Sequence, residues 1–368
     1  MKLGMEDERC VVHRSPLRTM ALKISYCRYR LLFRHPFGTA HGLRTGTDAV
    51  FIKAEESGLV GYGEATLPPY VNETVDSVIQ RLEALLRNVA TDASGLLERL
   101  EADRDLLRDG PGARAALHTA LMEIIINSHN DVVYQSNRHI QLKSTITLMT
   151  VGSGELADIP TKLKDTLQSG AVKVKLGSPN DKDALKLIKE LDHRPLFLDA
   201  NQGLGSVQDA LDRIAWADQD RVIGMEQPFP KDRSDLHAAL KAATQVPIYG
   251  DESIQSLADL EAQAGNFSGV NVKLMKCGGL DRVKEQIDRA RELGLKVMLG
   301  SMSESSLGCT AMARFARQAD VVDLDGPWLI RNDPFKGIGM LNGGLTMPEG
   351  PGLGATLCAE LDWTPIGA

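Results

Sequence analysis

Short apolar runs separated by amphipathic stretches fill the chain between residues 144 and 327. Runs such as AVKVKLG, VIGMEQPF and GVNVKLMK have the length of buried strands, and they recur at intervals of roughly 25 residues. The stretches between them, such as DKDALKLIKELDH and LDRVKEQIDRARELG, have the spacing of helices with one apolar face. Eight strands that alternate with helices predict a (β/α)8-type barrel. The runs begin near Ser144, Ala171, Pro195, Val222, Pro247, Gly269, Lys296 and Val321.

The segments on either side of this repeat follow other patterns. Residues 20–64 have the alternation of a β-meander, in which a strand to about Phe33 is followed by a loop over residues 34–48. Residues 72–127 are predicted mostly as helices, and the segment from about Gly339 onward is Gly-rich and short-stranded. These patterns allow two arrangements: a separate N-terminal α+β domain with a loose tail, or one cap over the barrel mouth built by both ends.

Composition and charge restrict the class of protein. A net charge of −7, a pI near 5.7 and the absence of a basic tract argue against nucleic-acid binding. No apolar run approaches the roughly 18 residues of a membrane span. The odd number of scattered cysteines, without a CxxC pair, favours reduced thiols in a cytoplasmic protein, and the sequence is compatible with a homo-oligomer. These cysteines are Cys10, Cys27, Cys277, Cys309 and Cys358.

Three carboxylates follow consecutive predicted strands. Asp199 lies in FLDANQG, Glu226 in GMEQP and Asp251 in YGDES, one strand–helix unit apart. Because barrel active sites lie at the C-terminal ends of strands, we expect the three side chains to share one rim. Adjacent carboxylates repel one another unless a cation lies among them, and oxygen ligands suit Mg²⁺ better than Zn²⁺. The sequence therefore predicts a magnesium site on this rim.

Lysines occupy two walls of the predicted barrel. Lys173 and Lys175 lie two apart in VKVKLG, so strand alternation points both to the same side. Lys273 and Lys276 lie three apart in NVKLMKCGG, so a regular strand cannot point both inward. The second and sixth strands of a ring of eight are diametrically opposed. This arrangement suits removal of a proton from one face of a carbon atom and its return to the other face.

The ordered motifs KVK, DANQG, EQP, GDES and NVKLMKCGG resemble the enolase superfamily, in its muconate-lactonising branch. The resemblance covers essentially residues 20–360. It implies a modified TIM barrel, (β/α)7β, with an N-terminal α+β capping domain that the C-terminal segment completes. The implied divisions are residues 1–19 as an extension, 20–140 as the cap, 141–335 as the barrel and 336–368 as the segment that returns to the cap.

The resemblance also implies roles for single residues. It assigns one Mg²⁺ per subunit to Asp199, Glu226 and Asp251, and the acid–base pair to Lys175 and Lys273. Lys273 occupies the NxK position of related sequences, so we prefer it to Lys276. Lys173 would support the enolate and lower the pKa of Lys175. The shared chemistry is removal of a proton next to a carboxylate, with the metal ion stabilising the enediolate.

The eighth predicted strand indicates the substrate. Asp323 and Asp325 lie two apart in VVDLDGP and resemble the pair with which dipeptide epimerases bind the free N-terminus of a dipeptide. Further candidates for substrate binding are weaker. Ser301 and Ser303 in GSMSESS are either ligands or caps of the following helix. The remaining two candidates are Thr147, expected to end the first strand, and Arg44 in the cap.

The cap loop around His41 and Arg44 differs from that of more compact Ala-Glu epimerases. Arg44 either pairs with an acidic substrate side chain or bonds the loop backbone, and the difference favours another or broader dipeptide preference. The stretch LMEIIINSHNDVVYQSNRH also departs from the family pattern, away from the catalytic motifs.

The leading hypothesis is an Mg²⁺-dependent isomerase that inverts the C-terminal residue of a dipeptide by a two-lysine 1,1-proton transfer. One alternative is an o-succinylbenzoate synthase or N-acylamino acid racemase of the same branch. The other is a metal-dependent barrel that binds peptides without catalysis.

Overall fold

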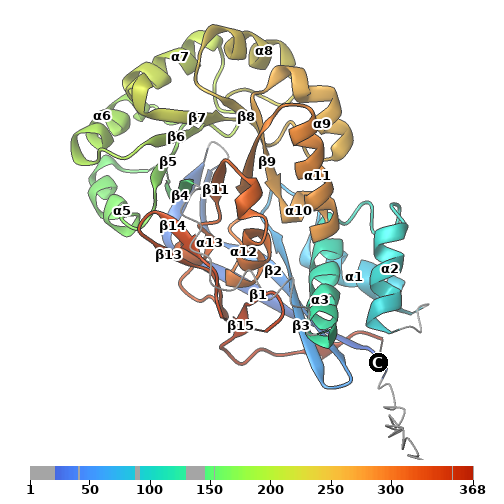
Figure 1. Ribbon diagram of the computed structural model, residues 1–368. Helices are drawn as coiled ribbons and strands as arrows, with labels where there is room; N and C mark the ends of the chain where they lie inside the picture. The colour runs from blue at the N-terminus through green and yellow to red at the C-terminus, as the bar shows by residue number, and fades with distance from the viewer. Residues whose placement is uncertain are drawn as a thin grey trace, which may run out of the picture.

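A closed barrel of eight parallel strands forms the larger part of the molecule, and a smaller α+β cap lies against it (Figure 1). The computed structural model describes residues 21–39, 42–87, 92–129, 146–152, 154–349 and 351–367. The barrel strands are β4 (Ile146–Val151), β5 (Ala171–Lys175), β6 (Leu196–Asp199), β7 (Val222–Glu226), β8 (Ile248–Gly250), β9 (Gly269–Lys273), β10 (Lys296–Gly300) and β11 (Val321–Asp323).

The strands follow one another around the ring in chain order, and β11 pairs with β4 to close it. Helices cover the outside because each one has an apolar face that packs on the strands. After β11 the chain makes only a short helix, so a full eighth helix is not formed. The helices are α5 (Ile159–Asp165), α6 (Asp181–Leu191), α7 (Val207–Trp216), α8 (Ser234–Ala243), α9 (Leu257–Gln263), α10 (Leu274–Cys277), α11 (Leu280–Glu292), α12 (Ser306–Ala313) and α13 (Gly326–Leu329).

Side chains fill the barrel interior below the mouth. The rings of Phe197 and Tyr249 pack there with their centroids 5.3 Å apart. Gly224 makes room for them, because a Cβ atom at this position would lie 2.5 Å from the Phe197 ring. The barrel is therefore a packed core with its chemistry confined to one end.

The cap is a four-stranded sheet with helices packed on one face. The first three strands are antiparallel, and one core contains the sheet and the helices. The prediction of a loop over residues 34–48 is wrong, because strand pairing continues through an irregularity between Leu32 and Phe37 to form one long hairpin. The elements are β1 (Lys23–Thr39), β2 (Gly42–Glu56), β3 (Leu59–Leu67), α1 (Val75–Leu86), α2 (Ala93–Ala102) and α3 (Pro111–His129).

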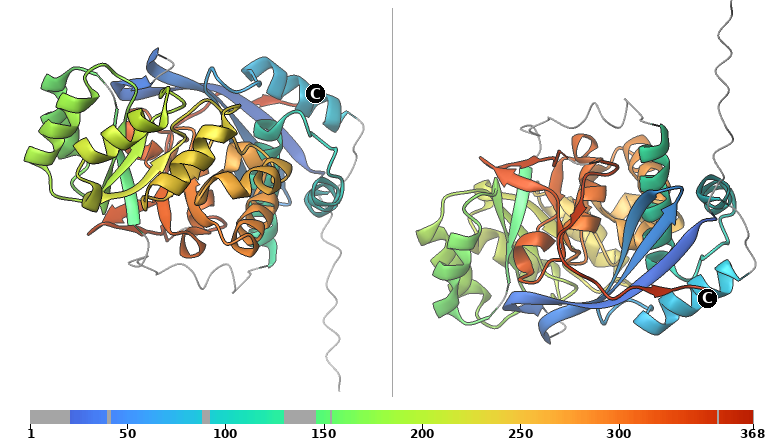
Figure 2. Two further views of the ribbon diagram at one scale, coloured as in Figure 1. Left: turned by 90° about the horizontal axis from the view of Figure 1, so that it is seen from above. Right: turned by 90° about the horizontal axis from the view of Figure 1, so that it is seen from below.

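The C-terminal segment runs from the barrel back to the cap, where its last strand lies along the blue sheet (Figure 2). The last strand, β16, pairs with β1, and the Ile366 amide donates to the Ile24 carbonyl at 2.8 Å. Of the two arrangements that the sequence allowed, the structure therefore has the shared cap. The other strands of this segment are β12 (Phe335–Lys336), β13 (Gly339–Leu341), β14 (Gly344–Thr346), β15 (Thr356–Leu357) and β16 (Thr364–Pro365).

The predicted fold class is confirmed by the closed barrel and its cap. The domain boundaries stay predictions. The extension over residues 1–19, the proposed strand start at Ser144, residue His41 and part of the altered stretch before the barrel lie outside the described residues. In the described part of the chain, no helix has the length and apolar character needed to cross a membrane.

Candidate active site

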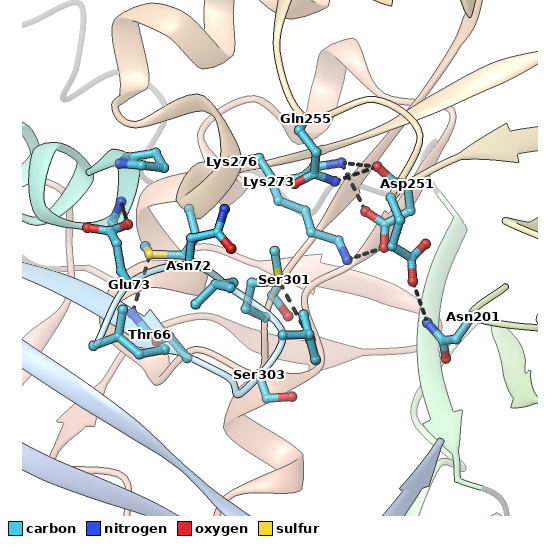
Figure 3. A pocket seen from close by; sticks show the side chains of 18 of the residues that line it. Thr66, Asn72, Glu73, Asn201, Asp251, Gln255, Lys273, Lys276, Ser301 and Ser303 are labelled. Atoms are coloured by element: carbon cyan, nitrogen blue, oxygen red, sulfur yellow. Dashed lines mark hydrogen bonds and ion pairs between the residues drawn. The ribbon is translucent and has the colours of Figure 1, made fainter. Parts of the chain in front are cut away.

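A cavity of about 660 Å³ lies between the cap and the C-terminal ends of the barrel strands. The cap contributes Asn72 and Glu73 to its wall, and the barrel contributes Asp251 and Lys273 on the opposite side (Figure 3). The volume is within the range of small-molecule sites, roughly 300–1,000 Å³. Most of the residues that the sequence analysis selected lie in or directly beneath this cavity.

The three predicted metal ligands end consecutive strands and are buried beneath the cavity. Asp199 ends β6, Glu226 ends β7 and Asp251 follows β8. They are at most 5% exposed. Among the described residues, no three His, Cys, Asp or Glu side chains surround a common metal position, because lysine ammonium groups lie between these carboxylates. The structure thus brings the three acids to one rim, and their role as metal ligands stays a prediction.

Lys173 and Lys175 both point from β5 into the carboxylate cluster. The Lys173 Nζ lies 2.9 Å from Asp199 Oδ2, 2.7 Å from Glu226 Oε2 and 2.7 Å from Asp323 Oδ2. Lys175, nearer the mouth, donates to Asp199 Oδ2 at 2.5 Å. The alternation argument therefore predicted the shared side of these two lysines correctly, because β5 is a regular strand through Lys175.

Lys273 and Lys276 lie on the opposite wall and have different surroundings. Strand β9 ends at Lys273, whose Nζ donates to Asp251 Oδ2 at 2.7 Å. The helix α10 begins at the next residue and carries Lys276, whose Nζ donates to the carbonyls of Asp251, Ile254 and Asn271 and to Asp251 Oδ1. These four acceptors saturate Lys276, so Lys273 is the better candidate for proton transfer.

The close packing of charge shifts the pKa values of the cluster. Burial, and then the charge of Asp199, raise the pKa of Glu226 to about 8. Burial alone would raise the pKa of Asp199, but Lys173 and Lys175 outweigh it and hold that pKa well below its usual value. Burial alone would lower the pKa of Lys273, but Asp251 and Glu226 raise it instead. Lys273 is therefore held as an ammonium group in this arrangement.

Asp323 and Asp325 both line the cavity, although the strand ends at Asp323. Asp323 pairs with Lys173 through Oδ2, while its buried Oδ1 has no hydrogen-bond partner. Asp325 accepts from the Thr150 amide at 2.8 Å. Burial, and then the charge of Asp323, raise the pKa of Asp325 to about 6. This pair thus has capacity for a further cation.

The structure corrects the placement of Thr147. It is the second residue of β4, near the far end of the barrel, and its hydroxyl donates to the Gly343 carbonyl at 2.6 Å. Thr150, three residues later, lines the cavity instead. The error came from placing the strand too early, because β4 continues to Val151.

The two serine candidates lie in the cavity wall (Figure 3). Ser303 has a left-handed backbone with φ of 67°. The cap of α12 is Ser305, whose hydroxyl accepts from the Leu307 amide at 3.2 Å. Ser301 and Ser303 are therefore not the caps of this helix and remain candidates for substrate contact.

Arg44 reaches the cavity from the cap. Its guanidinium carbon lies 5.3 Å from the centre of the Phe33 ring and 5.7 Å from that of Tyr70. The Nε and Nη2 atoms are buried and have no hydrogen-bond partner. Burial lowers the pKa of Arg44 from its ordinary value, yet an arginine stays charged at neutral pH. A partly desolvated cation between two aromatic faces suits an anionic group.

Sequence reasoning missed several polar residues of the cavity, and three of them lie near the proposed site residues. Tyr70 comes from the turn between β3 and α1, Asn201 from the turn after β6, and Glu252 from the loop after β8. Asn201 and Glu252 are the last residues of DAN and GDE, so their position near the predicted metal ligands was a usable signal. The sequence held no comparable signal for Tyr70, because this residue is far from the barrel along the chain.

Comparison with known proteins agrees with the fold. Residues 160–361 match the family described as enolase C-terminal domain-like, and residues 25–135 match the mandelate racemase / muconate lactonizing enzyme N-terminal domain. The chain is 35% identical over 334 residues to the L-Ala-D/L-Glu epimerase of Bacteroides thetaiotaomicron. The aligned region covers 90% of this chain and 87% of that protein.

Two solved structures extend this likeness. The substrate-liganded L-Ala-D/L-Glu epimerase from Bacillus subtilis has a TM-score of 0.80 at 27% identity, with 92% of this chain and 99% of that chain covered. The dipeptide epimerase from Methylococcus capsulatus, complexed with Mg and the dipeptide L-Arg-D-Lys, has a TM-score of 0.78 at 26% identity, with 91% and 99% covered.

A capped barrel with opposed lysines and a carboxylate rim defines an isomerase of the racemase and epimerase class. The chain belongs to the mandelate racemase / muconate lactonizing enzyme family of the enolase superfamily.

Proposed function

We propose that this protein is an Mg²⁺-dependent dipeptide epimerase that inverts the α-carbon of the C-terminal residue. In the reaction, the Nζ of one lysine takes the α-proton as the C–H bond breaks, and the electron pair passes into the carboxylate to form an enediolate. The lysine on the other wall then donates a proton to the opposite face of the carbon. No proton is gained or lost overall, so the substrate is changed only in configuration.

The observation that carries this proposal is the position of two lysines on opposite walls of one cavity. Lys175 comes from β5 and Lys273 from β9, which are four strands apart in the ring of eight. A non-catalytic peptide binder has no use for two opposed bases at the floor of its site. This arrangement therefore supports a two-base mechanism, in which each lysine serves one stereoisomer.

The donor set at the floor suits a divalent cation. Six carboxylates and four lysines form this floor, so the acids outnumber the lysines by two. Buried oxygens without a hydrogen-bond partner, Glu252 Oε2 and Asn271 Oδ1, lie in the same region. Asp199, Glu226 and Asp251 would hold the ion, which would stabilise negative charge on the substrate carboxylate. The four lysines are Lys173, Lys175, Lys273 and Lys276, and the other three acids are Glu252, Asp323 and Asp325.

The pair Asp323 and Asp325 supports a substrate with a free ammonium group. Both carboxylates are buried at the cavity wall, and Asp323 alone is paired with a lysine. An ammonium group of the substrate would satisfy Asp325 and the unpaired Oδ1 of Asp323. The relatives that act on dipeptides agree with this assignment.

Arg44 supports an acidic side chain as one accepted substituent of the substrate. Its unpaired Nε and Nη2 atoms are at the cavity wall, and they do not bond the loop backbone. Of the two roles that the sequence left open, the geometry favours pairing with a substrate carboxylate. The similarity to an L-Ala-D/L-Glu epimerase points the same way. A preference broader than acidic side chains stays a prediction.

Proton exchange with solvent tests the proposal. The protein is incubated in D2O with a library of dipeptides, and mass spectrometry reports substrates that gain one deuterium. We expect exchange at the C-terminal α-carbon together with inversion, loss of both after exhaustive chelation, and recovery with Mg²⁺. Full activity without a divalent cation would contradict the metal assignment, and no exchange with any dipeptide would contradict the substrate class.

The main alternative is an N-acylamino acid racemase or an o-succinylbenzoate synthase. Their substrates lack a free ammonium group, so Asp325 would face no cation and would repel an acidic ligand. The two functions separate in one comparison, in which the same dipeptide is supplied with a free or an acetylated N-terminus. Faster turnover of the acetylated form would favour the racemase.

A further inference from the structure

Asn201 is a second partner of Lys175. The Lys175 Nζ donates to Asn201 Oδ1 at 2.9 Å, in addition to its bond to Asp199. Asn201 lies two residues after Asp199, in the turn that leaves β6, and its side chain lines the cavity. Figure 3 shows Asn201 and Lys273 on opposite sides of Asp251. Asn201 therefore belongs to the wall of Lys175 and not to the wall of Lys273.

The backbone at Asn201 is held in an unusual conformation. Its φ of 42° lies in the left-handed region, and its amide donates to Asp199 Oδ1 at 3.0 Å. Non-glycine residues in this region carry strain, and asparagine is among those that tolerate it best. Such strain persists where surrounding contacts impose it, often at functional sites. Here the turn directs the amide side chain at the ammonium group of Lys175.

Glu252 fixes the orientation of that amide. Asn201 Nδ2 donates to Glu252 Oε1 across 3.4 Å, which leaves Oδ1 facing Lys175. With the amide turned the other way, its NH2 group would meet an ammonium group, and two donors cannot bond each other. Glu252 follows Asp251 after β8, and Asn201 follows β6, so the contact joins the loops after two strands that flank β7.

The chemistry of the partner matters because Lys175 has to lose and regain a proton. A carboxylate stabilises the ammonium form and resists deprotonation, whereas a neutral amide oxygen accepts an N–H bond from either form. A neutral acceptor can therefore hold the Nζ atom in place through the whole cycle. Lys175 and Lys273 both donate to a carboxylate, and Asn201 gives Lys175 a neutral acceptor in addition.

We propose that Asn201, oriented by Glu252, is a positioning residue that aims Lys175 at one face of the substrate α-carbon. The inference rests on the proposed function, because it assigns Lys175 to one stereoisomer. Its consequence is asymmetric: loss of Asn201 impairs proton transfer on the Lys175 face and leaves transfer on the Lys273 face intact. A residue with only a structural or metal-holding role would affect both faces alike.

The test measures α-proton exchange in D2O for the two C-terminal epimers of one dipeptide, each separately. Lys175→Ala and Lys273→Ala first identify which epimer depends on which lysine. For Asn201→Ala, we expect the exchange rate of the Lys175-dependent epimer to fall about 10- to 100-fold through kcat. The other epimer should exchange near the wild-type rate, which also shows that the variant is folded and binds its metal ion.

Three further variants sharpen the result. Glu252→Gln keeps the shape of the side chain but weakens its hydrogen bond with the Asn201 amide. It should therefore slow exchange of the same epimer, by a smaller factor than Asn201→Ala. Asn201→Asp places a charge beside Lys175 and should not restore the rate. Gln202→Ala is the matched control, since Gln202 is also left-handed, with φ of 69°, but bonds the Lys231 amide. It should affect the two epimers equally.

An equal loss for both epimers in Asn201→Ala, or no loss for either, would overturn the inference. That result is distinct from failure of the proposed function. If the wild-type protein exchanges neither epimer of any dipeptide, the substrate assignment itself is wrong and the inference falls with it.

Discussion

At the scale of single residues, neighbours decide what four chemically identical lysines do. Lys276 is saturated by three carbonyls and a carboxylate, and Lys173 lies among three carboxylates. Lys175 and Lys273 each bond one carboxylate and lie nearer the cavity. The proposed division between structural and reacting lysines therefore follows from contacts and not from residue type.

The Asp323 and Asp325 pair provides a first prediction at this scale. Replacement of Asp325 by Asn should lower kcat/KM for dipeptides about 10- to 100-fold, because a charge-assisted contact worth roughly 1.5–3 kcal/mol is lost. Acetylation of the substrate N-terminus should cause a similar loss in the wild-type protein. Steady-state kinetics checks both changes, with Mg²⁺ binding measured in parallel. An Asp325→Asn variant with undiminished turnover would show that the pair binds no ammonium group.

Arg44 provides a second prediction for a single residue. Arg44→Met keeps much of the contact with Phe33 and Tyr70 but removes the charge. For dipeptides with an acidic C-terminal side chain, kcat/KM should fall about 10- to 100-fold, because a charge-assisted hydrogen bond is lost. Dipeptides with an apolar side chain of similar length serve as the control and should be little affected. Equal losses for both kinds would assign Arg44 to the structure of the cap.

At the scale of elements, the start of helix α12 joins the cap to the barrel. Glu64 from strand β3 accepts hydrogen bonds from the amides of Ser305 and Gly308 at the start of this helix. Glu304, which directly precedes Ser305 in the chain, is also buried, and its Oε1 has no hydrogen-bond partner. Two acidic groups thus meet at an interface from which water is excluded. Burial, and then the charge of Glu64, raise the pKa of Glu304 to about 8.

This pKa predicts a pH dependence of stability. Between the ordinary pKa of 4.5 and about 8, folded Glu304 keeps a proton that the unfolded chain releases. The folded state thus binds more protons, so the free energy of unfolding falls as pH rises through this window, by up to roughly 5 kcal/mol. Glu304→Gln should remove the contribution of Glu304 and make the decline shallower, which urea unfolding at pH 5 to 9 would detect. The exposed Glu98→Gln should keep the wild-type slope, and an unchanged slope in Glu304→Gln would refute the assignment.

At the scale of the whole molecule, the site exists only where the cap meets the barrel. The cap contributes Arg44 and Tyr70 to a cavity whose proposed acid–base lysines come from barrel strands. A second contact, on the other side of the cap, joins α3 to α11. There the fully buried Arg114 forms two bonds with Asp281, at 2.9 and 2.7 Å, and donates to the carbonyls of Gly278 and Leu100.

The last prediction concerns this contact. Arg114→Leu removes two bonds to Asp281, which keeps its contact with His118, and leaves two carbonyls without this donor, so it should lower the free energy of unfolding by roughly 3–5 kcal/mol. Arg104→Leu is the matched control, because its pair with Glu285 joins the same two parts of the molecule at an exposed position. It should lower the stability by less than about 1 kcal/mol. Chemical denaturation of both variants measures whether loss of the buried pair lowers the free energy of unfolding more than loss of the exposed pair.

The sequence alone determined the barrel, the rim of acids and the two lysines of β5. These features depend on short-range patterns, since strand alternation and the strand–helix period place a residue on a face and at an end without knowledge of its distant neighbours. The candidates Asp199, Glu226 and Asp251 were found in this way. The same reasoning failed for Thr147, because it needs the true end of the strand, which local patterns place poorly.

Only the tertiary structure decided contacts between segments that are distant along the chain. It showed that Lys276 is saturated, that Arg44 lies between Phe33 and Tyr70, and that β16 completes the cap sheet. It also brought Asn201 and Glu252 together behind Lys175. Such contacts depend on the packing of whole elements, because a shift of a few ångströms between two elements makes or breaks a hydrogen bond without any change in the local pattern.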